Sequence, residues 1–147
     1  MRGRRVTARA ELEAVLRGAH TVAVLGAHTD PGRPACYVPD YLQLHGAHIL
    51  PVNPRLAGQA RWGEVFRADL REITGADAPQ GIDVLDVFRR AEDLPAHLQE
   101  ILDMPVRPRT VWFQLGIRND TVAEELLAAG LDVVQDRCML ADHRAWL

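Results

Sequence analysis

A glycine-containing loop directly after an apolar run is the first stretch of this chain that could do chemistry. The apolar residues Val22–Leu25 run into Gly26, and the loop Gly26–Arg33 follows. Such a run is typical of a parallel strand that is covered on both faces. The amphipathic stretch Ala35–Leu44 comes next, so the loop lies where a helix begins, and helix N-termini direct free N–H groups toward anions. We therefore interpret the loop as a cradle for the phosphates of a nucleotide.

The spacing of the loop residues narrows the choice of nucleotide. A dinucleotide-binding turn reads G-x-G-x-x-G, and an acid at the end of the next strand binds the ribose hydroxyls. Here residues 26–32 read GAHTDPG, and the second apolar run ends in Asn53-Pro54-Arg55 without an acid. An arginine at this place suits a ribose that carries a phosphate. Because the Gly-Lys-Ser/Thr sequence of a P-loop is also missing, the pattern disfavours NAD and ATP and leaves a nucleotide with extra phosphate.

The other reactive side chains form no catalytic or metal-binding set by their spacing. Six histidines are scattered along the chain, and only His28 lies in the loop. Cys36 falls in the first turn of the following helix, where we expect a small buried side chain. Cys138 follows the last apolar run, so it is also expected near the carboxyl ends of the strands. Asp86 lies within a strand and is expected to cap a neighbouring turn rather than to form a catalytic carboxylate pair with Asp83.

Composition sets further bounds. With 147 residues we expect one domain, spanning residues 1–147, on which a helix within residues 1–18 packs. The net charge of −3 gives no basic field for nucleic acid. All basic residues are arginine, which excludes lysine chemistry such as Schiff-base formation. No apolar run approaches the roughly 20 residues that span a bilayer, and the N-terminus does not resemble a signal peptide. We therefore expect a cytoplasmic protein without membrane contact. We also expect its two cysteines, which are far apart in the sequence, to be reduced thiols.

Alternating apolar runs and amphipathic stretches predict the elements that position the loop. The expected strands are Thr21–Leu25, His48–Val52, Ile82–Phe88, Thr110–Gln114 and Leu131–Val134. The expected helices are Ala8–Arg17, Ala35–Leu44, Glu64–Ile73, Ala91–Leu102 and Thr121–Ala129. We expect Thr7 to cap the first helix and Asn119 or Asp120 to cap the last one. The segment from Arg137 onward has no assigned structure.

This alternation predicts an α/β fold: a Rossmann-like, doubly wound parallel sheet of five strands with helices on both faces. Numbered along the chain, the strands are expected in the order 3-2-1-4-5. Ligands of such folds bind beyond the carboxyl ends of the strands, where the strand order reverses. Four segments should therefore line the site, namely Gly26–Arg33, Asn53–Arg55, Val87–Arg89 and Gln114–Ile117.

Four motifs together resemble a known family. They are Thr21–Pro54, IDVLDVFR at Ile82–Arg89, VWFQLGIRN at Val111–Asn119 and VVQDRC at Val133–Cys138. In this order and spacing they look like the small stand-alone CoA-binding proteins, whose fold is similar to the CoA-binding domain of the succinyl-CoA synthetase alpha subunit. The resemblance implies a Rossmann-like domain that binds coenzyme A and has no established catalytic activity. Serines that are frequent in the related loops are replaced here by His28 and Gly32.

The resemblance also implies a role for each site residue. The cofactor-binding residues it indicates are Gly26, Ala27 and His28 under the pyrophosphate, Arg33 on a phosphate, Asn53, Pro54 and Arg55 at the adenosine and its 3′-phosphate, Val87, Phe88 and Arg89 beside the adenine or ribose, and Gln114, Gly116 and Ile117 along the pantetheine arm. Arg89 could instead pair with Glu92 or Asp93 on the following helix.

Three functions remain open at this point. The leading hypothesis is a binding protein for CoA or an acyl-CoA, with no catalytic residue and no metal. The first alternative is a CoA-thioester or thiol-transfer enzyme in which Cys138 meets the CoA thiol. The second is a regulatory or assembly module that forms a homodimer in response to CoA. The larger partner domains of the synthetases are missing, so their phosphohistidine mechanism is not transferred.

Overall fold

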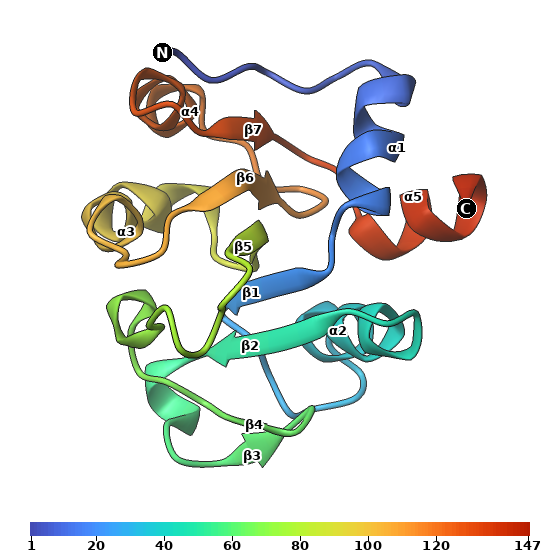
Figure 1. Ribbon diagram of the computed structural model, residues 1–147, viewed down its shortest axis with the longest axis vertical. Coiled ribbons are helices and arrows are strands. Elements are labelled where there is room, and N and C mark those ends of the chain that lie inside the picture. The colour runs from blue at the N-terminus through green and yellow to red at the C-terminus, as the bar shows by residue number, and fades with distance from the viewer.

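A five-stranded parallel sheet forms the centre of the computed structural model, which describes residues 1–147 (Figure 1). Its strands are β1 (Thr21–Leu25), β2 (His48–Val52), β5 (Ile82–Val87), β6 (Pro108–Phe113) and β7 (Asp132–Val134). Each strand lies within two residues of its expected bounds. The predicted class, a Rossmann-like α/β fold with a doubly wound parallel sheet, is confirmed.

The order of the strands differs from the expected one. The sheet runs β2-β1-β5-β6-β7, so that β1 pairs with β2 on one side and with β5 on the other. Numbered by the five expected strands, this order is 2-1-3-4-5, and the prediction of 3-2-1-4-5 is wrong. The predicted order would have placed β2 between two strands, although Pro51 in β2 has no N–H to donate. Proline inside a sheet is tolerated on an edge strand, and β2 is an edge strand.

The segment that connects β2 to β5 contains no α-helix, contrary to the helix expected at Glu64–Ile73. It forms a two-stranded hairpin of β3 (Ala60–Arg61) and β4 (Glu64–Val65) and then a 3₁₀ turn at Leu70–Glu72. Its apolar side chains enter two different cores, because Phe66 packs on one face of the sheet and Leu70 on the other. Apolar residues that pack on the two opposite faces of the sheet can have the same sequence spacing as the buried face of one helix.

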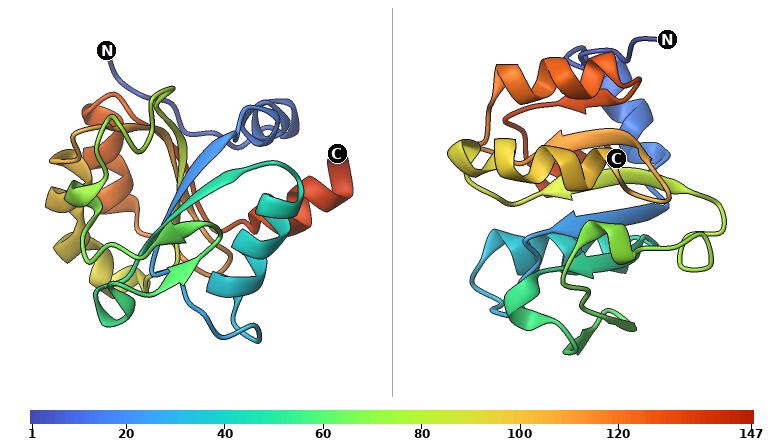
Figure 2. Two further views of the ribbon diagram at one scale, coloured as in Figure 1. Left: turned by 60° about the horizontal axis from the view of Figure 1, so that its bottom comes forward. Right: turned by 90° about the vertical axis from the view of Figure 1, so that its left-hand side faces the viewer.

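Helices cover both faces of the sheet, as Figure 2 shows. The bounds of the helices are α1 (Arg9–Arg17), α2 (Pro34–Leu44), α3 (Leu94–Leu102), α4 (Asp120–Ala128) and α5 (Met139–Trp146). One face buries α3 and α4 against Ala23 and Leu25 of β1, and the other buries α1, α2 and α5 against Val22 and Val24. Trp112 and Phe113 of β6 divide in the same way between the two cores. None of these helices combines the length and the apolar character that a bilayer-spanning helix requires.

The helix termini follow the expected capping residues only in part. Asn119 caps α4, because its side-chain oxygen accepts the Val122 N–H at 3.0 Å. Thr7 does not cap α1; Ala8 holds that position and makes no side-chain hydrogen bond. The segment from Arg137 onward, which had no assigned structure, forms α5.

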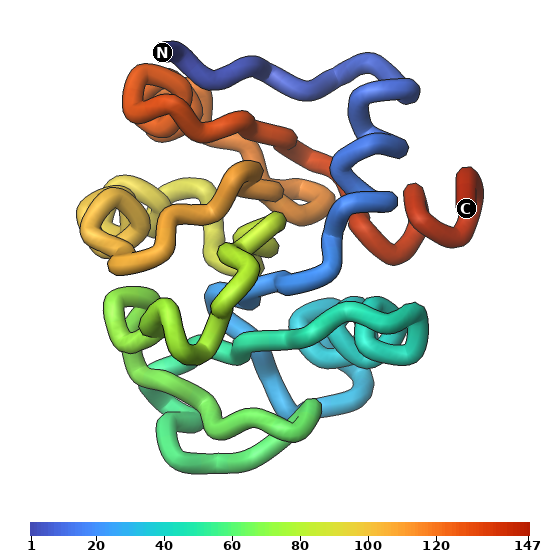
Figure 3. Tube along the Cα trace, viewed as in Figure 1, coloured from blue at the N-terminus to red at the C-terminus, as the bar shows by residue number.

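Both edges of the sheet are covered by short pieces of backbone. Beside β2, the Arg67 N–H donates to Pro51 O at 3.1 Å, and the Asn53 N–H donates to Arg67 O at 2.9 Å. Beside β7, the N-terminal residues 4–6 run parallel to the strand, and the Val6 N–H donates to Val133 O at 2.9 Å (Figure 3). Each edge strand of the five-stranded sheet is therefore paired with another segment of backbone over part of its length.

Two aspartates of β5 have different environments. Asp83 accepts the backbone N–H groups of His20 and Thr21 at 3.1 and 2.9 Å and thereby fixes the start of β1. Asp86 was expected to cap a turn, but it is fully buried and neither of its carboxyl oxygens has a hydrogen-bond partner. It lies between Val24 and Trp112 of the neighbouring strands. Burial raises the pKa of the Asp86 carboxyl well above its ordinary value, because the site disfavours the charged form.

Candidate functional site

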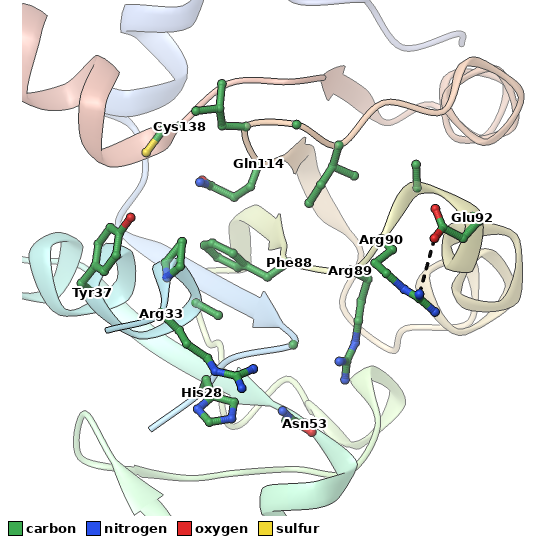
Figure 4. A pocket seen from close by; sticks show the side chains of 17 residues that line it. His28, Arg33, Tyr37, Asn53, Phe88, Arg89, Arg90, Glu92, Gln114 and Cys138 are labelled. Atoms are coloured by element: carbon green, nitrogen blue, oxygen red, sulfur yellow. Dashed lines mark ion pairs between the residues drawn. The ribbon is translucent and has the colours of Figure 1, made fainter. Parts of the chain in front are cut away.

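A cavity of about 760 Å³ opens at the carboxyl ends of β1, β5 and β6, beside the first turn of α2 and the start of α5 (Figure 4). The strand order reverses next to β1, so the cavity lies where ligands of doubly wound sheets bind. The residues that line it are Gly26, His28, Arg33, Pro34, Ala35, Tyr37, Asn53, Phe88, Arg89, Arg90, Ala91, Glu92, Gln114, Leu115, Gly116, Ile117 and Cys138.

Nine of the thirteen predicted site residues line this cavity: Gly26, His28, Arg33, Asn53, Phe88, Arg89, Gln114, Gly116 and Ile117. The other four lie outside it. Ala27 and Val87 are fully buried in the two cores, and Pro54 is exposed. Arg55 lines an adjacent cavity of about 350 Å³, which shares His28, Arg33, Asn53, Arg89 and Arg90 with the first.

Gly26 has a structural reason to be glycine that does not involve a ligand. Its φ of +84° is a conformation that residues with a Cβ rarely adopt. A Cβ at this position would lie 2.6 Å from the carbonyl oxygen of Phe88. The end of β5 therefore approaches the loop so closely that only glycine fits.

We expect Gly26→Ala to lower the free energy of unfolding by about 2–4 kcal/mol, because the strain of a left-handed alanine adds to the clash with Phe88. Gly116→Ala is the matched control, since Gly116 has a φ of +85° but open space around its Cβ position. It should cost only about 1 kcal/mol. Urea unfolding of both variants measures these free energies. Equal losses of stability would show that the clash between the added Cβ and Phe88 contributes nothing.

Most backbone amides of the loop are already used within the chain. The Gly26 N–H donates to Val52 O at 2.8 Å, and the His28 N–H donates to Ala35 O at 3.1 Å. These two amides of the predicted pyrophosphate site are therefore engaged within the chain. By contrast, the N–H of Ala35, in the first turn of α2, makes no hydrogen bond and lies at the cavity. It is the amide at this helix N-terminus that is available to an anion.

Two polar side chains of the cavity wall are fixed by hydrogen bonds. His28 Nδ1 accepts the Asp30 N–H at 2.9 Å, so the neutral ring carries its proton on Nε2 and offers it as a donor. Asn53 is buried, donates from Nδ2 to Ala27 O and accepts the Arg55 N–H, each at 3.0 Å. Asn53 thus connects the loops after β1 and β2, and one N–H and one oxygen lone pair of its amide remain without a partner in the chain.

The arginines of the two cavities fall into two groups. Arg33 lies 3.6 Å from the carboxylate of Asp30, and Arg90 lies 3.0 Å from Asp93 and 3.6 Å from Glu92. These side chains have carboxylate partners within the chain. The pairing with Glu92 or Asp93 that was considered for Arg89 is therefore made by Arg90.

Arg89 and Arg55 form no ion pair and share the smaller cavity. Arg89 is partly buried, and its Nε atom is inaccessible to solvent and has no hydrogen-bond partner. Burial lowers the pKa of the Arg89 guanidinium, and the positive charge of Arg55 lowers this pKa further against the opposing effects of Glu100 and Asp93. A guanidinium remains charged under such shifts. The two arginines therefore carry positive charge into one cavity without a carboxylate at ion-pair distance from either, which is an arrangement that attracts phosphate.

Sequence reasoning did not assign several lining residues to the site, namely Pro34, Ala35, Tyr37, Arg90, Ala91 and Glu92. Tyr37 lies on the first turn of α2 and is 43% exposed. Arg90 and Glu92 lie at the 3₁₀ turn Ala91–Asp93, directly after β5. Their positions in the sequence could have indicated that they belong to the site. Residues directly after a strand that ends at the site, or in the first turn of a helix that begins there, face the same crevice.

Solved structures with this architecture cover almost the whole chain. A protein from Thermus thermophilus, described as cell-free ID.343, has a TM-score of 0.86 and 44% sequence identity, and the match covers 96% of this chain and 100% of that one. A hypothetical protein from Pyrococcus horikoshii OT3 has a TM-score of 0.81 at 25% identity, covering 99% of this chain and 97% of that one.

The amino-acid sequence has relatives of the same length. It is 33% identical over 137 residues to the uncharacterized protein YneT of Bacillus subtilis strain 168, which covers 92% of this chain and 93% of that protein. The profile of the family described as "CoA binding domain" matches residues 20–144. This match includes the loop after β1 and every segment that lines the cavity, and the chain therefore belongs to the CoA-binding domain family.

Proposed function

We propose that this protein binds coenzyme A in the cavity at the carboxyl ends of β1, β5 and β6, and that binding rather than catalysis is its function. The observation that carries the proposal is the presence of two arginines, Arg89 and Arg55, that form no ion pair within the chain and lie beside a cavity of about 760 Å³. CoA carries a diphosphate and a ribose 3′-phosphate, which match two arginines that form no ion pair within the chain. Membership of the CoA-binding domain family supports the same ligand.

The chemistry of the wall suggests how CoA would lie. Arg33, Arg89 and the free Ala35 N–H would hold the diphosphate, and Arg55 would hold the 3′-phosphate. Phe88, which lies between the arginines and Gln114 in Figure 4, would pack against the adenine or ribose. The pantetheine arm would then extend along Gln114, Gly116 and Ile117. No histidine or carboxylate is hydrogen-bonded to Cys138, so the thiol has no general base for catalysis on a CoA thioester, which supports binding as the function.

Isothermal titration with CoA, dephospho-CoA, NAD and ATP tests this proposal. We expect CoA to bind most tightly, because it alone carries both the diphosphate and the 3′-phosphate. Titrations in the presence of a thiol reductant keep the ligand in its free thiol form. Binding of NAD or ATP with equal or higher affinity would contradict the proposal.

We expect Arg55→Ala to reduce the preference for CoA over dephospho-CoA, because the two ligands differ only in the 3′-phosphate. Arg55 is exposed, so the loss should be about fivefold or less. The affinity for dephospho-CoA itself should stay the same. An equal loss of affinity for both ligands would place Arg55 on another part of the molecule.

A further inference from the structure

One end of the cavity brings a cysteine and a buried amide together. Cys138 directly precedes α5, and Gln114 follows β6. Both line the cavity on the side away from Asn53 and Arg89 (Figure 4). Tyr37 completes this end of the cavity. Because CoA has its phosphates at one end and its thiol at the other, phosphates held at Arg89 would direct the thiol toward Cys138.

The side chain of Gln114 has one hydrogen-bonding group without a partner. Gln114 is only 3% exposed, and its Oε1 accepts the Met139 N–H at 3.1 Å. This bond fixes the amide, whose Nε2 donates no hydrogen bond within the chain and borders the cavity. Nε2 is therefore prepared for an acceptor from a ligand, such as an amide carbonyl of the pantetheine arm.

The same hydrogen bond positions Cys138. Met139 is the next residue along the chain, so its hydrogen bond to Gln114 anchors the backbone that carries the Cys138 thiol. Cys138 is partly exposed. Cys36, the other thiol, is fully buried outside the cavity lining, and burial, followed by the negative charge of Asp40, raises its pKa. The two cysteines therefore differ in access to a ligand, and only Cys138 can meet one in the cavity.

We infer that Cys138 is a thiol–disulfide exchange site for the disulfide form of CoA. This inference rests on the proposed function, since the same arginines would hold the nucleotide end. The Cys138 thiolate attacks one sulfur of CoA disulfide, having lost its proton to solvent. The Cys138–CoA disulfide bond forms as the S–S bond of CoA disulfide breaks. The second CoA leaves as a thiolate with the electron pair and takes a proton from water, and CoA disulfide is the oxidant that is reduced.

The exchange would make ligand release depend on redox conditions. Reduced CoA would bind and leave reversibly, whereas the mixed disulfide would stay in the cavity until another thiol attacks it. Because the nucleotide is held at the far end, its sulfur is presented to Cys138 at a high effective concentration. A disulfide that lacks the nucleotide does not have this advantage.

The test is mass spectrometry of the reduced, desalted protein after incubation with CoA disulfide. We expect one CoA per chain, located on Cys138 by peptide mapping and removed by dithiothreitol. Cys138→Ser should abolish the adduct, and the matched control Cys36→Ser should retain it. Glutathione disulfide, which has no nucleotide, should react at least about tenfold more slowly.

Calorimetry with reduced CoA separates this inference from the proposed function. If the wild-type protein binds reduced CoA, but the adduct forms on Cys36, fails to form, or forms equally fast with glutathione disulfide, the exchange site is wrong and the proposed function stands. If reduced CoA does not bind, both are wrong.

Discussion

Arg89→Gln is expected to weaken CoA binding by about 10- to 100-fold. The estimate corresponds to the loss of hydrogen bonds between a charged, partly buried guanidinium and a phosphate, each worth about 1.5–3 kcal/mol. Arg89 forms no ion pair or side-chain hydrogen bond within the chain, and Glu100 and Asp93 act on it only through their charge, so its removal breaks no direct contact. Isothermal titration with CoA measures the change, and thermal unfolding shows that the variant is folded.

Arg90→Gln is the matched control for Arg89. Arg90 is the next residue and also lines the cavity, but it is exposed and already pairs with Asp93. Exposed ion pairs contribute about 0–1 kcal/mol, so we expect its removal to change CoA affinity by less than about fivefold. Equal effects of the two substitutions would show that general positive charge, and not the buried guanidinium of Arg89, attracts the ligand.

Asp86→Asn is expected to stabilise the protein at neutral pH. The buried Asp86 carboxyl has no hydrogen-bond partner, and burial raises its pKa well above the ordinary value. Folding at pH 7 therefore requires either the uptake of a proton or the burial of an unpaired charge. Asparagine has a similar shape and is neutral at every pH, so it removes this cost.

The gain from Asp86→Asn should depend on pH. In the unfolded chain the aspartate loses its proton near its ordinary pKa, about 3.9. Between that value and the raised pKa of the folded state, the folded protein binds one proton more. The stability of the wild type therefore falls as pH rises, by about 1.4 kcal/mol per pH unit. The advantage of Asp86→Asn should be small near pH 4 and grow toward neutral pH.

Urea unfolding of Asp86→Asn at several pH values measures this trend. Asp83→Asn is a control of opposite sign, because Asp83 accepts two backbone N–H groups at the start of β1 and its replacement should destabilise the protein. A stability difference between Asp86→Asn and wild type that is independent of pH would mean that Asp86 does not bind a proton on folding.

The strands and the class of fold could be predicted from the sequence, because buried parallel strands are short, uninterrupted apolar runs. The order of the strands could not be predicted from these runs alone. Only Pro51 indicated that β2 is an edge strand, since a central strand must donate hydrogen bonds to both neighbours. The helix expected at Glu64–Ile73 failed for a related reason: Phe66 and Leu70 pack on opposite faces of the sheet, and sequence periodicity does not tell one face from the other.

The position of the candidate site could be predicted, but the state of its polar groups could not. The carboxyl ends of the strands meet at one edge, which is why most predicted residues line one cavity. Whether an amide is free depends on distant partners. Gly26 is needed for the approach of Phe88, and its N–H is used by Val52. Likewise, Arg89 and Arg90 are neighbours in sequence, yet only Arg90 reaches the carboxylate of Asp93.

The two covered edges of the sheet have a consequence for self-association. An open edge strand offers unpaired N–H and C=O groups to a second molecule and can lead to aggregation. Here the backbone of Arg67 pairs with the edge strand β2, in which Pro51 also has no N–H to donate. Residues 4–6 pair with the edge strand β7. Removal of the first six residues is therefore expected to expose the edge of β7 and to offer a template for strand addition.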